Sequence, residues 1–231
     1  MKVDFSKFEQ KIGIQFKNKK LLQQAFTHRS YLNERPSWPL PHNERLEFLG
    51  DAVLELVVTE YLYSQYPEKP EGELTSLRAA LVNANALSGT ASEIGMNDYL
   101  LLSRGEAKDV GRARQYILAN TFEALIGALY LDQGYTVVYS FIKDVLLWRT
   151  SEILEQGLWR DAKSLFQEKA QEIVGITPHY EVLKEWGPDH DKHFVVGVFL
   201  DKEKVAEGEG PSKQAAQQQA AESALKIKQW S

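Results

Sequence analysis

The sequence predicts an all-α domain followed by a small α+β domain with the element order α-β-β-β-α. Up to about residue 155, apolar residues recur at helical spacing, and no convincing alternation of period two is found. Prolines within 36–41 and 67–70 break this helical region, and none follows until Pro178. Beyond Pro178, alternating apolar and polar residues separated by turn signals indicate strands. These three observations favour two folding units.

The elements can be placed in order along the chain. Loops are expected at the two proline-rich stretches. The pattern changes near residues 156–160, after which a helix, three strands and a last helix are expected. The predicted helices after the second loop cover residues 74–94, 112–133, 137–154, 162–173 and 213–228, and the predicted strands cover 178–186, 194–200 and 204–208.

Composition narrows the function classes. The chain has 231 residues, a formal net charge of −5 and no cysteine. Without cysteine, disulfides, thiolate nucleophiles and iron–sulfur clusters are excluded. The acidic balance argues against nucleic-acid binding driven by net charge alone. Charges interrupt the N-terminus, and no run approaches the ~18 apolar residues of a membrane span. We therefore expect a cytoplasmic protein with no membrane partner.

A group of carboxylates lies on a strongly apolar predicted helix that begins after Asn43, a suitable N-cap. Glu47 and Asp51 are four residues apart and share one face, with Glu44 one turn earlier. Apolar residues nearly encircle this helix, which predicts that it is largely buried. Buried carboxylates need positive compensation, and oxygen ligands favour Mg²⁺ or Mn²⁺. A solvated acidic stripe paired with cations such as Arg45 is the alternative.

A second polar pair interrupts another apolar helix. Asn120 and Glu123 are three residues apart, hence neighbours on the helix surface. Small residues around them permit close approach of another helix: Ala119, Ala124, Gly127 and Ala128. If this helix packs on the first, four oxygen-bearing side chains meet. The alternative is a polar pair satisfied within a core.

The motifs resemble those of a known family. Residues 43–54, NERLEFLGDAVL, resemble the signature of the ribonuclease III family, and residues 119–129 resemble its second acidic motif. Residues 24–31 and 71–75 are similar to other recurring segments of the family. Segments 161–168 and 208–225 resemble the first and last helices of a double-stranded-RNA-binding domain. The resemblance implies a nuclease domain at 1–154, a linker at 155–160 and a binding domain at 161–231.

The resemblance implies an Mg²⁺-dependent endonuclease, in which Mn²⁺ can substitute, that hydrolyses double-stranded RNA as a homodimer. Its products carry 5′-phosphates, 3′-hydroxyls and short 3′ overhangs, and it acts in the processing of rRNA and other RNAs. By the same resemblance, Asp51 and Glu123 are catalytic, and Glu44 and Glu71 are accessory acidic residues. The implied metal ligands are Glu47, Asp51, Asn120 and Glu123.

Position 120 departs from the family pattern, since Asp is the usual residue there and this chain has Asn. An amide oxygen can still ligate Mg²⁺, but the ligand set loses one negative charge. We expect an active enzyme with a raised Mg²⁺ requirement. The alternative is a catalytically weakened or silent RNA-binding protein.

The resemblance also implies contacts with RNA. Double-stranded RNA is recognised through 2′-hydroxyls and phosphates rather than bases. A solvated helix face is the alternative for Gln167 and Glu168, and a helix N-cap is a compatible second role for Ser212. The implied RNA contacts are Ser164, Gln167, Glu168, His190, Ser212 and Lys213.

The binding domain is poor in cations. From residue 157 onward, the sequence contains ten Lys and Arg and twelve Asp and Glu, which gives a net charge of −2. This balance predicts modest binding with weak salt sensitivity. Residues 208–213 contain two glycines but do not match a phosphate-binding loop, so no nucleotide cofactor is expected.

Overall fold

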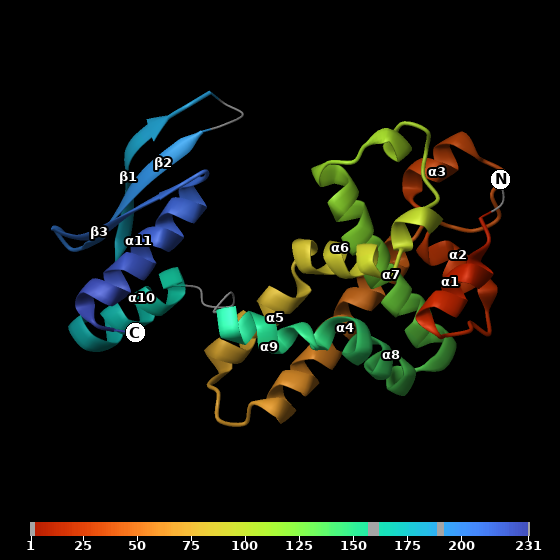
Figure 1. Ribbon diagram of the computed structural model, residues 1–231, viewed down its shortest axis with the longest axis horizontal. Coiled ribbons are helices and arrows are strands. Elements are labelled where there is room, and N and C mark those ends of the chain that lie inside the picture. Colours follow the sequence, from red (N-terminus) through yellow and green to blue (C-terminus); the bar gives the residue numbers. More distant parts are fainter. Residues whose placement is uncertain (1–2, 157–161, 189–191, 231) are drawn as a thin grey trace. The chain divides into compact units, whose positions relative to one another are not determined.

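The computed structural model describes residues 3–156, 162–188 and 192–230, and the chain divides into two compact units, Met1–Trp159 and Arg160–Ser231 (Figure 1). Of the linker predicted at 155–160, residues 157–160 lie outside the described residues. No described helix is long and apolar enough to span a membrane.

The first unit is helical apart from an isolated bridge between Thr27 and Leu101, which confirms the predicted fold class for its described residues. Two 22-residue helices, α4 and α7, pack together at its centre (Figure 1). The helices are α1 (Phe5–Ile12), α2 (Lys19–Ala25), α3 (Arg29–Glu34), α4 (Glu44–Gln65), α5 (Glu71–Val82), α6 (Ala84–Glu93), the 3₁₀ turns η1 (Met96–Tyr99) and η2 (Glu106–Lys108), α7 (Arg112–Gln133), α8 (Tyr135–Ile142), the π-helical segment η3 (Lys143–Leu147) and α9 (Arg149–Gln156).

The helix predicted over 74–94 is two helices, α5 and α6. Asn83 separates them because its backbone is extended, with ψ of 159°, and its side chain accepts a hydrogen bond from the backbone N–H of Ala86 at 3.0 Å. Asn83 therefore serves as the N-cap of α6. The helix predicted over 137–154 is likewise interrupted, by the π-helical segment Lys143–Leu147.

Asn43 lies at the N-cap position of α4, as predicted, but it does not cap the helix with its side chain. Its backbone is helical and its side chain makes no capping bond. Instead, the buried Asn43 amide donates to the carbonyl oxygen of Ala25 at 3.0 Å, which ties the start of α4 to the end of α2. The reason is tertiary: a buried amide needs a partner, and the α2 carbonyl supplies one.

The prediction that α4 is largely buried is correct for only part of its surface. Leu54, Val57 and Val58 lie in the core, but Phe48 is 83% exposed and Tyr63 is 74% exposed. An exposed apolar face of this length indicates a surface that binds another molecule.

The second unit has the predicted α-β-β-β-α order, with α10 (Ala162–Val174), β1 (His179–Trp186), β2 (His193–Leu200), β3 (Glu203–Gly210) and α11 (Lys213–Lys228). The strands form an antiparallel sheet in the order β1-β2-β3, and the two helices share a core with it (Figure 1). Phe166 of α10, Val198 of β2 and Ala220 of α11 meet in that core.

Strand β3 is longer than predicted because it pairs with β2 as far as Phe194 opposite Gly210. Helix α11 approaches this strand closely at Gly208. A Cβ added to Gly208 would lie 2.7 Å from the carbonyl carbon of Gln219, so only glycine fits there. The small residues Ala216, Ala220 and Ala224 of α11 are fully buried, as such close packing requires.

Candidate functional site

The two helices that carry the predicted site residues touch at a pair of glycines. A Cβ added to Gly50 of α4 would overlap the carbonyl oxygen of Glu123 and lie 2.8 Å from the Gly127 nitrogen. A Cβ added to Gly127 of α7 would lie 3.0 Å from the Gly50 nitrogen. Backbone therefore packs on backbone at this crossing, as the small residues of α7 predicted. Glu47 lies three residues before Gly50 and Asp51 directly after it. The crossing therefore holds both carboxylates beside Glu123.

Three predicted carboxylates lie close enough to perturb one another. Burial, then Asp51 and Glu47, raise the pKa of Glu123 to about 7. Burial, then Glu44 and Asp51, raise the pKa of Glu47. Burial disfavours the ionised form of each carboxyl, and the like charges beside it add to this effect, which explains both directions. The structure thus brings Glu47, Asp51 and Glu123 into one electrostatic site.

The cluster lacks compensating cations. Among the residues that the structure describes, Glu47, Asp51 and Glu123 form no ion pair. Glu44 is different, because its carboxylate lies 3.5 Å from Arg29 Nη1 and 3.8 Å from His42 Nδ1. On α4, the ion-paired alternative therefore describes Glu44, although its partners are Arg29 and His42 and not Arg45. Asp51 is exposed but forms no ion pair with a described residue.

Asn120 is exposed on α7, one turn before Glu123. Neither side chain hydrogen-bonds to another described residue, so a polar pair satisfied within a core does not describe them. Thr121, which lies between them in the sequence, is the polar residue that is satisfied within the core. Its buried hydroxyl donates a hydrogen bond to the Ile117 carbonyl oxygen at 2.7 Å. Asn120 is thus free to offer its amide oxygen to a ligand.

The donor set fits a hard divalent cation. Glu47, Asp51, Asn120 and Glu123 offer side-chain oxygen atoms, and burial followed by the charges of Asp51 and Glu47 raises the pKa of Glu123 to about 7. Mg²⁺ prefers such oxygens and keeps several waters. Within the described ranges, however, no group of three His, Cys, Asp or Glu side chains is placed so that it could hold a metal ion.

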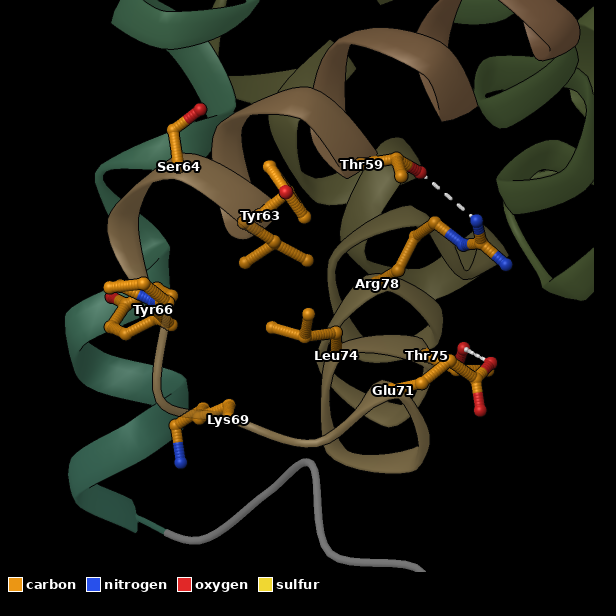
Figure 2. A pocket seen from close by; sticks show the side chains of 11 residues that line it. Thr59, Tyr63, Ser64, Tyr66, Lys69, Glu71, Leu74, Thr75 and Arg78 are labelled. Atoms are coloured by element: carbon orange, nitrogen blue, oxygen red, sulfur yellow. Dashed lines mark hydrogen bonds between the residues drawn. The ribbon is translucent and has the colours of Figure 1, made fainter.

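Sequence reasoning missed a hollow between the end of α4 and α5 (Figure 2). Its volume is about 690 Å³, and Tyr63, Tyr66 and Leu74 form its apolar wall. Glu71, the predicted accessory residue, lines the same hollow and accepts a hydrogen bond from the Thr75 hydroxyl at 2.9 Å (Figure 2). The sequence signal for this hollow was the set of apolar residues all around α4. We interpreted that pattern as burial of the helix, whereas part of it lines an exposed surface.

The predicted RNA-contacting residues occupy two places in the second unit. Ser164, Gln167 and Glu168 are exposed on α10. Ser212 is the N-cap of α11, because its hydroxyl accepts from the Ala215 N–H at 3.1 Å. Lys213 is exposed in the first turn, with Nζ 5.6 Å from the centre of the Phe194 ring. The remaining predicted contact, His190, lies outside the described residues.

The Glu123 pKa predicts how stability changes with pH. Because this pKa rises from 4.5 to about 7 on folding, the metal-free native state binds the proton more tightly than the unfolded state. Stability from this group is therefore present below pH 4.5 and lost as pH rises to about 7. We expect Glu123→Gln to remove this loss. Thermal unfolding with a chelator, from about pH 5 to about pH 8, measures it; parallel curves for both proteins would contradict the assignment.

Comparisons with known proteins match a family model to each of the two units. A family model described as Ribonuclease-III-like matches residues 18–150, and a double-stranded RNA binding motif matches residues 162–228. Proteins named Ribonuclease 3 from Bacillus cytotoxicus and Bacillus cereus are each 47% identical over 222 residues, covering 96% of this chain and 90% of theirs.

Solved structures are similar to the first unit. Two structures of the nuclease domain of ribonuclease III from Campylobacter jejuni superpose with a TM-score of 0.56 at 39% and 40% identity. They cover 62% and 63% of this chain and 95% and 94% of those domains. One was described for flexibility in a region involved in dimer formation.

Proposed function

Because this chain belongs to the ribonuclease III family and is an endonuclease of double-stranded RNA, we propose that it cleaves at the α4–α7 crossing with Mg²⁺ as its cofactor. The observation that carries this proposal is the uncompensated group of Glu47, Asp51 and Glu123. Asn120 completes the proposed ligand set, and Mn²⁺ can replace Mg²⁺ because both accept oxygen ligands.

When bound, Mg²⁺ supplies an activated water and neutralises charge on the phosphate. Asp51 and Glu123 would hold the ion and would orient the attacking water toward phosphorus. As the water oxygen bonds to phosphorus and gives up a proton to solvent, the bond from phosphorus to the 3′ oxygen breaks. The 3′ oxygen takes up a proton from water, so the products carry a 5′-phosphate and a 3′-hydroxyl. Without the cation, the carboxylates would repel the RNA, so binding of metal and RNA support each other.

Incubation with a long RNA duplex and Mg²⁺ tests this function. We expect fragments with 5′-phosphates and short 3′ overhangs, and no products from the same RNA as single strands. Analysis of the fragment ends by ligation identifies the products. Binding without cleavage at every Mg²⁺ and Mn²⁺ concentration would instead show a silent RNA-binding protein and would overturn the proposal.

Restoring the missing charge at position 120 is expected to strengthen metal binding. The Asn120→Asp substitution should lower the Mg²⁺ concentration for half-maximal cleavage by about three- to tenfold, because it adds one anionic ligand. A magnesium titration of the cleavage rate measures the change. The matched control is Asn97→Asp, an exposed residue of η1. Equal midpoints for Asn120→Asp and the unmodified protein would refute the ligand role.

We also propose that two copies pair through an exposed apolar stripe of α4, formed by Phe48, Ala52, Leu56 and Tyr63. Phe48 and Tyr63 lie on either side of Leu56, by about 12 Å and about 10 Å along the helix axis. In an antiparallel pair centred near Leu56, Phe48 of one copy therefore meets the other copy's hollow beside Tyr63 (Figure 2). The same pairing brings Glu71 of one copy toward the carboxylates of the other.

Placing a charge on this stripe is expected to separate the copies. Phe48→Glu should shift the protein from dimer to monomer at micromolar concentration, because an anion would be buried without a partner. Analytical ultracentrifugation measures the change. Val110→Glu is the control, since Val110 is 90% exposed and lies outside the stripe. A dimer that persists in Phe48→Glu would exclude this face as the interface.

The second unit carries a double-stranded RNA-binding motif, and we propose that it holds the substrate duplex. In this proposal, Ser164, Gln167 and Glu168 of α10 contact a minor groove, and Ser212 and Lys213 contact phosphates at the start of α11. His190 is proposed for the next groove on the resemblance alone. The proposed boundaries are 1–154, 155–160 and 161–231. A cytoplasmic location and a role in processing rRNA and other RNAs complete the proposal.

A further inference from the structure

A second hollow of about 290 Å³ lies where the start of α7 meets the start of α6. Unlike the apolar hollow of Figure 2, it is surrounded mainly by amide, guanidinium and phenol groups. Its lining residues are Asn83, Ala84, Asn85, Arg112, Gln115 and Tyr116. Such a group of hydrogen-bonding side chains suits a polar ligand with at least one negative charge.

The hollow and the proposed cleavage site lie along the same face of α7. Arg112, Tyr116, Asn120 and Glu123 follow one another at intervals of three or four residues, so they share one face of α7. At 1.5 Å per residue, Tyr116 lies about 6 Å and Arg112 about 12 Å along the axis from Asn120. A nucleic-acid strand held at the metal site can therefore continue past both side chains.

Three side chains of the hollow are available for binding, whereas Asn83 is engaged in capping α6. Within the described ranges, Arg112, Asn85 and Gln115 form no side-chain hydrogen bond or ion pair. The neighbouring Arg114 contrasts with Arg112, because it donates to the carbonyl oxygens of Asp109 at 3.0 Å and Glu106 at 2.8 Å. Arg114 thus organises the loop before α7, whereas Arg112 has no structural task of this kind.

Tyr116 offers a second type of contact. Its ring is 54% exposed on the cleavage-site face of the helix, so its hydroxyl can both donate and accept hydrogen bonds. In an RNA duplex, the 2′-hydroxyl is the group in the minor groove with the same dual capacity. The Arg112 guanidinium can bind a phosphate and the Tyr116 phenol can bind a ribose hydroxyl. Together they match one ribose-phosphate unit of RNA.

We propose that this hollow is a subsite for a nucleotide of the substrate strand that flanks the cut. Arg112 holds the phosphate, and Tyr116 contacts the adjacent 2′-hydroxyl, with Asn85 and Gln115 completing the polar surroundings. The subsite rests on the proposed function, since it needs a cut at the metal site. Its chemistry makes it a determinant of RNA over DNA near the cut.

The phosphate contact is tested with Arg112→Gln in single-turnover cleavage of a short duplex with one cut site. We expect the half-saturating enzyme concentration to rise by about three- to tenfold, and its dependence on salt to weaken by about one phosphate contact. Lys20→Gln, an exposed cation on α2, is the matched control and should change neither value. Unchanged concentration and salt dependence in Arg112→Gln would overturn the contact.

The ribose contact is tested with a series of duplexes that each carry one 2′-deoxynucleotide near the cut. At one position, the deoxy substitution should slow the unmodified protein several-fold but have no further effect on Tyr116→Phe. A merely structural tyrosine would not produce this position-specific result. Tyr130→Phe, at the other end of α7, should keep the penalty. An equal penalty at every position in both variants would refute the assignment.

Three further outcomes separate this proposal from others. If the unmodified protein does not cut the duplex, the proposed function is overturned, and the subsite that rests on it is overturned too. If it cuts and the variants behave like it, the subsite fails and the function stands. A free mononucleotide, the other source of the same chemistry, should not displace the duplex. Displacement that is lost in Arg112→Gln would show a nucleotide-binding site and overturn an RNA subsite.

Discussion

Asp51→Ala is expected to reduce the rate of duplex cleavage by about a hundredfold to ten-thousandfold, the range found when a group that positions a reacting proton or water is removed. Asp51 is exposed on α4, and its charge contributes to the raised pKa of both Glu47 and Glu123. In the proposed mechanism, its removal takes away one metal ligand and one of the two groups that orient the attacking water. Single-turnover cleavage at saturating Mg²⁺ measures the loss.

The chain offers a matched control for this substitution. Glu55 lies one turn beyond Asp51 on the same helix, is also exposed, and has no place in the proposed ligand set. We expect Glu55→Ala to cleave at nearly the original rate, and both variants to keep their melting temperatures because both positions face solvent. Similar losses in the two variants would show that general acidity of α4, and not a site at Asp51, supports cleavage.

Gly50→Ala is expected to destabilise the first unit by about 3 kcal/mol, at the upper end of the usual cost of overpacking. The added Cβ would overlap the Glu123 carbonyl oxygen and lie 2.6 Å from its carbon. Both are backbone atoms of a buried helix, so they can move only if α4 and α7 separate. Urea unfolding followed by circular dichroism measures the loss of stability.

Gly89→Ala separates this packing effect from the general effect of alanine in a helix. Gly89 lies within α6, and nothing approaches within 4 Å of the position where its Cβ would lie. We expect this variant to gain about 0.5–1 kcal/mol, because alanine has the higher helix propensity. The two substitutions should therefore change stability in opposite directions. A loss of similar size in both would contradict the steric explanation.

The same crossing links stability to activity. Any separation of α4 from α7 moves Glu123 away from Glu47 and Asp51. The part of Gly50→Ala that remains folded should therefore bind Mg²⁺ more weakly and show a Glu123 pKa closer to its usual range. Folding and the proposed catalysis are linked at this contact, because the proposed ligands come from the two helices that pack together there.

Some elements could be predicted closely from local signals. Helix α7 runs from Arg112 to Gln133 and α11 from Lys213 to Lys228, as predicted, since Gly111, Gly134 and Ser212 mark their ends. The break between α5 and α6 was missed, because Asn83 is compatible with a helix interior and its capping bond to Ala86 is visible only in three dimensions.

The sequence by itself determined which side chains can carry the chemistry and where helices give way to strands. Spacing of three or four residues already placed Glu47 beside Asp51 and Asn120 beside Glu123, since helical periodicity is local. Family resemblance on the two motifs then indicated the reaction.

Tertiary structure alone decided how these local pairs combine. The Gly50–Gly127 crossing joins carboxylates more than seventy residues apart and raises the pKa of Glu123, an effect of burial and neighbouring charge that no spacing encodes. It also decided that Phe48 faces solvent and that Asn43 bonds to α2 instead of capping α4. Apolar residues around a helix show that it needs partners; only packing shows which face the rest of the chain leaves uncovered.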